Sequence, residues 1–258
     1  MKLHYRKLGE GRPIVIIHGI LGASDNWMYI GRKLDSRFSV YLLDLRNHGR
    51  SPHSDEFNYE VIVEDLAEFV ADHHLEGPAI IGHSLGGRIA MRFALSNPSA
   101  INRLVVVDIS PQNRPSANIQ FLPDVLETMQ RLPLSELQTR KEVDKRLSKV
   151  VPDLRERQLL LKNLRRKEDH SFAWKANLEV IRRNMHLVYE AIESDNQFDK
   201  PTLFLRGENS DYITGADREK ILELFPRARI VTIPKAGHWL HADAPEEVAA
   251  AILAFMES

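Results

Sequence analysis

The sequence predicts an α/β protein whose mostly parallel, doubly wound sheet carries an inserted helical cap. Apolar runs typical of buried strands alternate with amphipathic segments before residue 111 and again after residue 197. Residues 111–197 differ because they are densely charged, show helical periodicity and contain almost no β-branched runs. We therefore predict a core made of residues 1–110 and 198–258, with residues 111–197 as the cap (lid).

The elements expected before the cap follow from the pattern of apolar residues. A weak alternation over residues 2–7 predicts an edge strand, and apolar runs predict further strands over 13–17, 38–43, 79–81 and 103–109. Helical spacing predicts helices over 59–74 and 88–95. The repeated order of strand and helix is typical of a parallel sheet with helices on both faces.

The cap and the end of the chain complete this pattern. Helical periodicity predicts cap helices over 121–131, 134–150, 154–166 and 177–192. Strand character returns over 201–206 and 229–233, and a closing helix is expected over 245–256. The strands after the cap are therefore expected to add to the sheet that the first half of the chain begins.

The composition excludes several classes of protein. Charge is balanced, with 35 Lys and Arg against 36 Asp and Glu, so nothing indicates a nucleic-acid or membrane partner. There is no cysteine, which excludes disulfides, thiolate catalysis and cysteine-based metal sites. The N-terminus lacks the apolar core of a signal peptide, and no apolar run is long enough to span a bilayer. We expect a cytoplasmic protein, and the composition carries no signal for its oligomeric state.

The pattern Gly82-x-Ser84-x-Gly86 is typical of a nucleophile elbow, a sharp turn between a strand and a helix. An apolar run precedes it and helical spacing follows it, which distinguishes it from an ordinary glycine-rich connection. Such a turn holds the serine oxygen above the sheet, at the positive end of the helix. The sequence therefore predicts Ser84 as a nucleophile.

A serine nucleophile needs a base within hydrogen-bond reach and an acid that orients the base. His238 lies in a glycine-bounded loop between the last strand and the last helix, where the base is expected, and His241 is the weaker candidate. The acid has two candidates, which follow neighbouring strands. Asp108 follows the strand after the elbow, whereas in the commoner loop the expected spacing reaches Ser210 and the acid, Asp211, comes one residue later. We favour Asp108 and keep Asp211 as the alternative.

The segment 18–22 follows the first buried strand and is flanked by glycines. A turn in this place is able to point a backbone N–H into the space above the sheet, where acyl transfer needs an oxyanion donor. We predict that the N–H groups of Ile20 and Leu85 form the oxyanion hole, with Leu21 as the alternative to Ile20. We interpret His18 and His48 as structural residues of their turns.

Three large aromatic residues are candidates for contacts with a substrate. Phe172 and Trp174 lie in the predicted cap, where they face either the mouth of the site or the cap's own core, and Trp239 adjoins the predicted base. We take all three as substrate-binding candidates. The basic cluster over 162–167 is interpreted as a solvated helix face, with attraction of an anionic substrate as the minority alternative.

Several stretches together carry a resemblance to a known family. They are His18-Gly19-Ile20-Leu21-Gly22, Asp44-x-Arg46-Asn47-His48-Gly49, Gly82-His83-Ser84-Leu85-Gly86-Gly87, Asp108-Ile109-Ser110-Pro111, Arg206-Gly207-x-Asn209-Ser210-x-Tyr212 and Gly237-His238-Trp239-x-His241. They span nearly the whole core, and the chain resembles the α/β-hydrolase superfamily. Within it, the chain is similar to the branch of small bacterial esterases and acyl-CoA thioesterases that also includes a mitochondrial hydrolase. The resemblance implies Asp108 as the acid, and the acid at position 211 departs from that branch.

We therefore expect a serine hydrolase that cleaves carboxylic esters with short to medium acyl chains, and acyl thioesters as a further substrate class. It would act on a small molecule through an acyl-enzyme on Ser84, His238 and Asp108, without a cofactor or metal. A first alternative is a C–C hydrolase or lyase on the same triad, as in menaquinone biosynthesis, with Arg165 or Arg166 binding an acidic substrate. A second alternative is a non-catalytic ligand receptor on the same fold.

Overall fold

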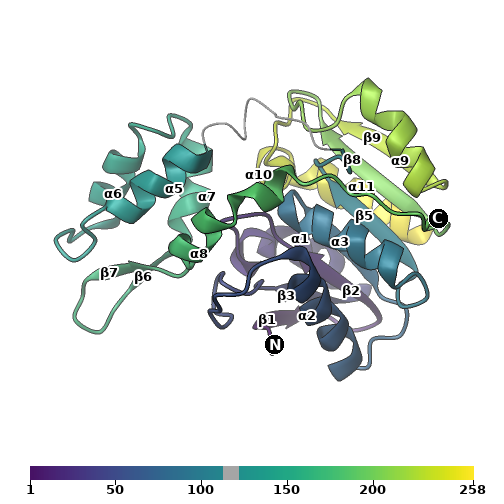
Figure 1. Ribbon diagram of the computed structural model, residues 1–258, viewed down its shortest axis with the longest axis horizontal. Helices are drawn as coiled ribbons and strands as arrows, with labels where there is room; N and C mark the ends of the chain where they lie inside the picture. Colours follow the sequence, from purple (N-terminus) through teal and green to yellow (C-terminus); the bar gives the residue numbers. More distant parts are fainter. Residues whose placement is uncertain (113–121) are drawn as a thin grey trace.

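A seven-stranded sheet forms the centre of the protein in this computed structural model, which describes residues 1–112 and 122–258 (Figure 1). In their order across the sheet, the strands are β1 (Tyr5–Leu8), β3 (Phe38–Leu43), β2 (Arg12–Ile17), β4 (Ala79–His83), β5 (Arg103–Val107), β8 (Thr202–Gly207) and β9 (Ala228–Ile233). Strand β1 runs antiparallel to β3, and every other neighbouring pair is parallel. The predicted α/β fold with a mostly parallel sheet is confirmed.

Helices cover both faces of this sheet. Helices α1 (Met28–Leu34) and α11 (Pro245–Glu257) pack against each other, as do α2 (Tyr59–Asp72) and α3 (Leu85–Ser96). Strand β2 belongs to both layers, because Val15 and Ile17 join the core under α2 and α3, whereas Ile14 and Ile16 join the core under α1 and α11. A strand that is buried on both faces has no polar alternation, which explains the continuous apolar run in the sequence.

Three helices of the core do not correspond to any predicted element. These are α1, α9 (Arg218–Leu224) and α10 (Leu240–Asp243). They have 7, 7 and 4 residues, so each offers two turns or fewer of periodic pattern. In α1 the pattern is further interrupted by Gly31, whose missing side chain lets the helix approach Leu8 and Leu42.

The described residues between β5 and β8, called the insertion below, contain more helix than strand. They form α5 (Leu122–Arg131), α6 (Arg140–Leu147), α7 (Leu154–Leu161), α8 (Leu178–Arg183) and a 3₁₀ helix over Met185–Tyr189. Phe121, where the first helix was predicted to begin, lies outside the described residues. The predicted helix over 154–166 ends at Leu161, because β6 (Leu164–Arg166) and β7 (Phe172–Trp174) form an antiparallel hairpin. Strands of three residues are too short to show alternation in the sequence.

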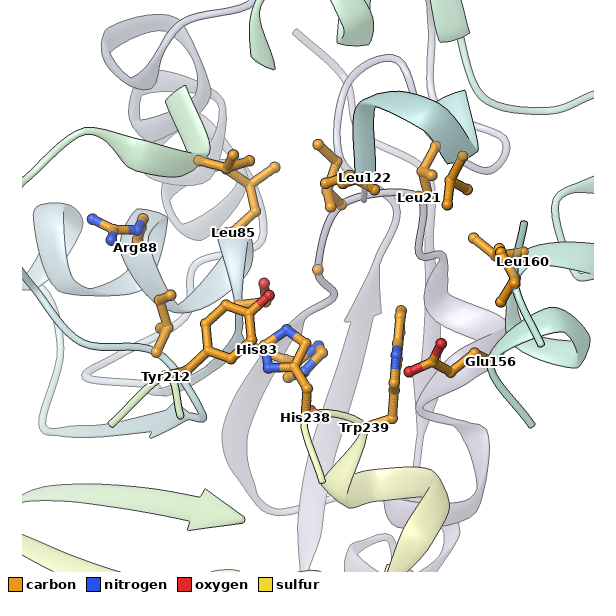
Figure 2. A pocket seen from close by; sticks show the side chains of 17 residues that line it. Leu21, His83, Leu85, Arg88, Leu122, Glu156, Leu160, Tyr212, His238 and Trp239 are labelled. Atoms are coloured by element: carbon orange, nitrogen blue, oxygen red, sulfur yellow. The ribbon is translucent and has the colours of Figure 1, made fainter. Parts of the chain in front are cut away.

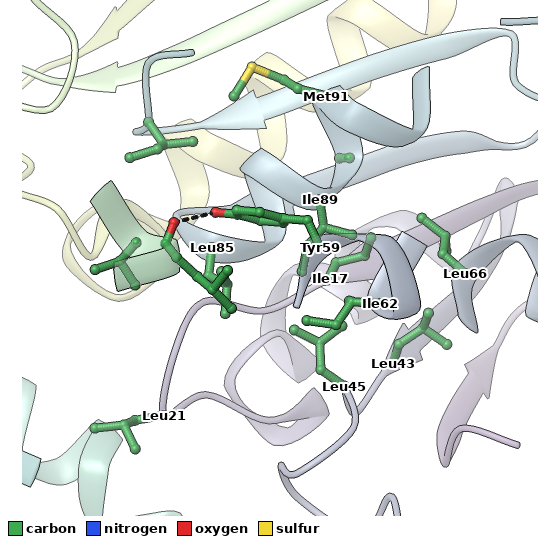
Figure 3. Packing of buried hydrophobic residues seen from close by; sticks show 14 of the residues in the cluster. Ile17, Leu21, Leu43, Leu45, Tyr59, Ile62, Leu66, Leu85, Ile89 and Met91 are labelled. Carbon is green, nitrogen blue, oxygen red and sulfur yellow. Dashed lines mark hydrogen bonds between the residues drawn. The ribbon is translucent and has the colours of Figure 1, made fainter. Parts of the chain in front are cut away.

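The insertion shares a core with the helices α2 and α3 of the main body. Buried side chains of α5, α6, α7 and α8 belong to the same hydrophobic cluster as those of α2 and α3. Figure 3 shows one polar contact of this cluster, in which the Tyr59 hydroxyl of α2 donates a hydrogen bond of 2.7 Å to the Leu187 carbonyl of the insertion. Residues at the carboxyl ends of β2 and β4 line one cavity together with residues of the insertion.

Helix α3 begins very close to β2, and Gly86 makes this approach possible. A Cβ atom at Gly86 would lie 2.5 Å from the carbonyl oxygens of both Ile17 and His18. We expect Gly86→Ala to displace the helix and to lower the free energy of unfolding by about 1–3 kcal/mol, measured by urea denaturation. Gly215→Ala is the control, because no atom lies within 4 Å of its added Cβ, and it should change stability by less than about 0.5 kcal/mol. Equal effects of the two substitutions would contradict this interpretation of α3.

Candidate active site

Ser84 connects β4 to α3 in a strained backbone conformation. Its φ angle is 53°, in the left-handed region that side chains other than glycine rarely adopt. Its N–H donates a hydrogen bond of 3.1 Å to the Val107 carbonyl at the end of β5. The turn is therefore fixed by the neighbouring strand, and the side chain stays partly exposed in a cavity above the sheet.

His238 lies in the loop after β9, and its ring contacts the carboxylate of Asp108. His238 Nδ1 and Asp108 Oδ2 are 2.9 Å apart, in a pair whose side chains are 12% and 0% exposed. His238 lines the same cavity as Ser84. The structure thus brings together the three residues that the sequence predicted as nucleophile, base and acid. Asp211, the alternative acid, is exposed.

The carboxylate of Asp108 has two further partners, at the end of β8 and on the loop that follows it. The Gly207 N–H donates a hydrogen bond of 2.9 Å to Oδ1, and the Ser210 hydroxyl donates to Oδ2. Asp108 itself has a φ angle of 50°, which turns its side chain toward this loop directly after β5. Ser210 is the third residue after Gly207, the position at which the commoner loop of this fold carries the acid. Here its hydroxyl binds the acid that follows the neighbouring strand.

The loop that carries His238 is held in place by two aromatic side chains. The ring of Tyr212 stacks on the His238 imidazole, with 3.8 Å between centroids and an angle of 15° between planes. On the other side, His83 Nε2 lies 2.9 Å from the His238 carbonyl oxygen. Since these contacts involve the ring face and the backbone, they leave the edge of the imidazole that carries Nε2 free of these two neighbours.

The cavity is lined mainly by apolar side chains from both the core and the insertion (Figure 2). Its lining residues are Gly19, Ile20, Leu21, His83, Ser84, Leu85, Arg88, Ile109, Leu122, Val125, Val151, Glu156, Leu160, Val188, Tyr212, His238 and Trp239. Arg88, at the end of the cavity opposite Glu156 in Figure 2, donates hydrogen bonds to the Glu190 and Gln112 carbonyls. Its guanidinium therefore ties the two ends of the insertion to α3.

Of the three predicted substrate-binding residues, the structure brings only Trp239 to this cavity. Phe172 and Trp174 lie in β7, at the far end of the insertion in Figure 1. The Trp174 indole N–H donates a hydrogen bond of 2.8 Å to the Met129 carbonyl, and the Phe172 ring lies under the Arg166 guanidinium. Both rings therefore pack within the insertion, which is the second of the two placements that the sequence left open.

The turn after β2 is braced by two buried histidines. His18 Nε2 accepts a hydrogen bond of 3.1 Å from the Leu45 N–H, and His48 Nε2 accepts one of 3.2 Å from the Leu21 N–H. Their Nδ1 atoms lie 2.7 and 2.9 Å from the backbone carbonyls of Gly19 and Arg46, so each ring is neutral with its proton on Nδ1. Both histidines have the structural contacts expected from the sequence.

Both backbone polar groups of Leu21 have a hydrogen-bond partner. Its φ angle is 56°, its N–H is bound by His48, and its carbonyl accepts a hydrogen bond from the Asn163 side chain of the insertion. The Gly22 N–H closes the turn with a hydrogen bond of 2.9 Å to the Gly19 carbonyl. The backbone direction of this turn, including the Ile20 peptide that lines the cavity, is therefore fixed from two sides.

Comparison with known proteins identifies the family to which the chain belongs. The sequence model of a family described as alpha/beta hydrolase fold matches residues 12–245. The chain belongs to the alpha/beta hydrolase fold family. It is 37% identical over 256 residues to sn-1-specific diacylglycerol lipase ABHD11 of Danio rerio. The match covers 96% of this chain and 80% of that relative. Esterase YbfF of Escherichia coli strain K12 is 30% identical over 246 residues, 95% of this chain and 92% of the relative.

A solved structure supports the same family assignment. The structure described as a marine microorganism esterase superimposes with a TM-score of 0.95 at 43% identity, covering 98% of this chain and 99% of that one. The resemblance to an esterase branch of the superfamily is therefore confirmed. The prediction of a carboxylic ester hydrolase agrees with the names of these relatives. In the part of the chain that the structure describes, none of the helices is both long and apolar enough to cross a membrane.

Three residues of this site were not predicted from the sequence. Ser210 binds Asp108, Tyr212 stacks on His238, and Glu156 lines the cavity from α7. The spacing from Gly207 to Ser210 was a usable signal, since a polar side chain at that position meets the end of β5. Glu156 gave no signal, because one charged residue among many on a predicted helix does not stand out.

The buried histidines make the fold sensitive to acid. Burial lowers the pKa of His48 and of His241 to about 3, whereas an unfolded histidine titrates near 6.5. As the pH falls below about 6.5 the unfolded chain binds protons first, so each of these residues should cost about 1.4 kcal/mol of stability per pH unit. This stability is fully present above pH 6.5.

We expect His48→Gln to flatten the loss of unfolding free energy between pH 7 and pH 5, measured by denaturant titration at each pH. The control is His186→Gln, because His186 is exposed and its removal should leave the slope unchanged. A wild-type stability that does not change over this range, or the same slope in His48→Gln as in wild type, would contradict the assignment of His48 as a buried neutral group.

Proposed function

We propose that the protein is a serine hydrolase that cleaves carboxylic esters with short to medium acyl chains through an acyl-enzyme. The observation that carries the proposal is the 2.9 Å contact between His238 Nδ1 and the buried Asp108, beside Ser84 in one apolar cavity. The names of the relatives, esterase and lipase, support ester hydrolysis in general. Acyl thioesters remain a further substrate class, since the same acyl-enzyme would form from either.

Each residue of the proposed triad has one role. The Ser84 oxygen attacks the ester carbonyl while Nε2 of His238 takes its proton, and His238 then gives this proton to the leaving alkoxide. Asp108 holds the imidazole with its proton on Nδ1 and stabilises the imidazolium that forms. A water molecule repeats the cycle on the acyl-enzyme. Within these steps the chain needs no group other than its own side chains and backbone.

The tetrahedral intermediate needs two backbone donors, for which we propose the N–H groups of Leu85 and Ile20. Leu85 is the first residue of α3, where backbone N–H groups have no partner within the helix. In the turn after β2, the N–H of Leu21 is bound to His48 and that of Gly22 to Gly19. This argues for Ile20 over the alternative, Leu21.

The lyase alternative has less support. It relied on Arg165 or Arg166 to bind an acidic substrate, and both lie exposed on β6, outside the cavity lining. Among the described lining residues Arg88 is the only arginine or lysine, and its hydrogen bonds go to backbone carbonyls. A multiply charged acid would therefore enter an apolar cavity without a free cation.

We expect Ser84→Ala to abolish hydrolysis of p-nitrophenyl butyrate while leaving the thermal unfolding transition within a few degrees of wild type. The hydroxyl faces the cavity and contributes no core packing, so only the chemistry is lost. Labelling of wild type, but not of the variant, by a fluorophosphonate tests the same nucleophile and excludes a receptor without activity. Residual hydrolysis within tenfold of wild type would refute Ser84 as the nucleophile, and a lyase would barely hydrolyse this ester.

Two isosteric substitutions separate the candidate acids. Asp108→Asn should lower kcat by about 10⁴, because the imidazole then loses the partner that fixes its tautomer. Asp211→Asn is the control and should cost less than about tenfold, because its exposed carboxylate changes only the local potential. Steady-state kinetics on one ester, with thermal unfolding to confirm folding, decides between them. The reverse order of losses would assign the acid to position 211.

A further inference from the structure

Glu156 is the only acidic side chain among the described residues that line the cavity. It lies in the first turn of α7, where the Asp153 side chain accepts a hydrogen bond of 3.0 Å from its N–H. Figure 2 shows its carboxyl group beside the indole of Trp239, with Leu160 as a further neighbour. An acid in a mainly apolar cavity needs a chemical explanation, because a partly buried charge loses part of its hydration there.

The carboxylate of Glu156 is partly exposed, and its hydrogen-bond partner in the cavity is the indole of Trp239. Burial raises the pKa of Glu156, and the nearby carboxylates of Asp153 and Asp243 raise it further. Opposing this, His238 and a hydrogen bond from Trp239 favour the charged form. A carboxylate has two oxygens and about four acceptor sites, so one indole N–H leaves most of them available to a ligand.

The charge of Glu156 is not neutralised by the cavity itself. Arg88, the only arginine or lysine in the described lining, lies at the opposite end in Figure 2. Its hydrogen bonds go to the Glu190 and Gln112 carbonyls. In the described part of the chain, Arg155 forms its ion pair of 3.5 Å with Asp243 rather than with Glu156. A bound molecule that supplies a donor would therefore stabilise the carboxylate.

The position of Glu156 indicates which part of an ester it meets. His238 must protonate the leaving alkoxide, so the alcohol part of the ester lies on the imidazole side of the cavity. Trp239 follows His238 in the chain and contacts Glu156 through its indole. The carboxylate thus lies on the side where the alcohol leaves. An uncharged donor suits this place better than an ammonium group, whose desolvation costs more.

We propose that Glu156 determines specificity for the alcohol part of the substrate, by accepting a hydrogen bond from a free hydroxyl of that alcohol and by repelling anionic alcohols. This inference rests on the ester hydrolysis proposed above and names its substrate class. The class is uncharged esters of diols or polyols that keep at least one hydroxyl free. Esters of alcohols that carry a carboxylate or phosphate are disfavoured, because a second negative charge in a cavity of low dielectric is repelled strongly.

Three butyrate esters that differ only at the end of the alcohol test the proposal. Propyl butyrate ends in a methyl group, 3-hydroxypropyl butyrate in a hydroxyl, and 3-(butanoyloxy)propanoate in a carboxylate. We expect the wild type to prefer the hydroxyl ester over the propyl ester in kcat/KM by about tenfold, as a charge-assisted hydrogen bond allows. The anionic ester should be about tenfold worse than the propyl ester, or worse still.

Two variants and one control separate the hydrogen bond from the charge. Glu156→Gln keeps the size and an acceptor oxygen but removes the charge, so discrimination against the anionic ester should disappear while part of the hydroxyl preference remains. Glu156→Leu should lose both. Glu179→Gln removes an exposed charge elsewhere in the insertion and should keep both wild-type ratios. Released butyrate is measured, and thermal unfolding of each variant confirms that it is folded.

The outcomes distinguish this proposal from the one on which it rests. Loss of both substrate ratios in Glu156→Leu, with both kept in Glu179→Gln, supports the role of Glu156. Wild-type ratios close to one, or the same ratios in wild type and Glu156→Leu, overturn that role and leave ester hydrolysis standing. A wild type that hydrolyses none of the three esters, nor p-nitrophenyl butyrate, overturns the ester hydrolysis itself and this inference with it.

Discussion

The buried carboxylate of Asp108 is the constraint on which the geometry of the site depends. A charged group that is 0% exposed is stable only when donors surround it, and here three segments supply them. The end of β8 donates through Gly207, the turn after it through Ser210, and the loop after β9 through His238. The need to satisfy one carboxylate thus fixes how three strand ends meet at one edge of the sheet.

The elements that the sequence predicted well are those whose pattern has a single physical cause. Strands β2, β3 and β5 are buried on both faces, so each appears in the sequence as a short continuous apolar run. Such a run is typical of a buried strand and is shorter than a usual helix. Ser84 was identifiable because the Gly-x-Ser-x-Gly pattern stands between an apolar run and helical spacing, as in a strained turn between strand and helix. His238 followed from chain order, because the base comes last in this fold.

The features that the sequence left open depend on contacts between distant residues. The spacing after Gly207 favoured Asp108 but left Asp211 open, and the difference becomes visible only when the Asp108 carboxylate is found buried against His238. Trp174 was assigned to the substrate because a large ring suggests an interface, but its indole N–H finds a partner at the end of α5. The hairpin of β6 and β7 was missed for a related reason, since three-residue strands are defined by their pairing rather than by their pattern.

The insertion and the proposed oxyanion turn are coupled through buried polar groups. The Leu21 carbonyl is satisfied by Asn163, which is 1% exposed, and the Asn47 carbonyl accepts a hydrogen bond of 2.9 Å from the Asn177 N–H. A buried carbonyl that loses its donor costs about 1–3 kcal/mol. Moving the insertion away from the core would therefore release the turn that aims the Ile20 peptide into the cavity. The same segment that carries Glu156 also holds the turn of the proposed oxyanion donor, so both proposed roles, selection of the substrate and stabilisation of its transition state, depend on one placement of the insertion.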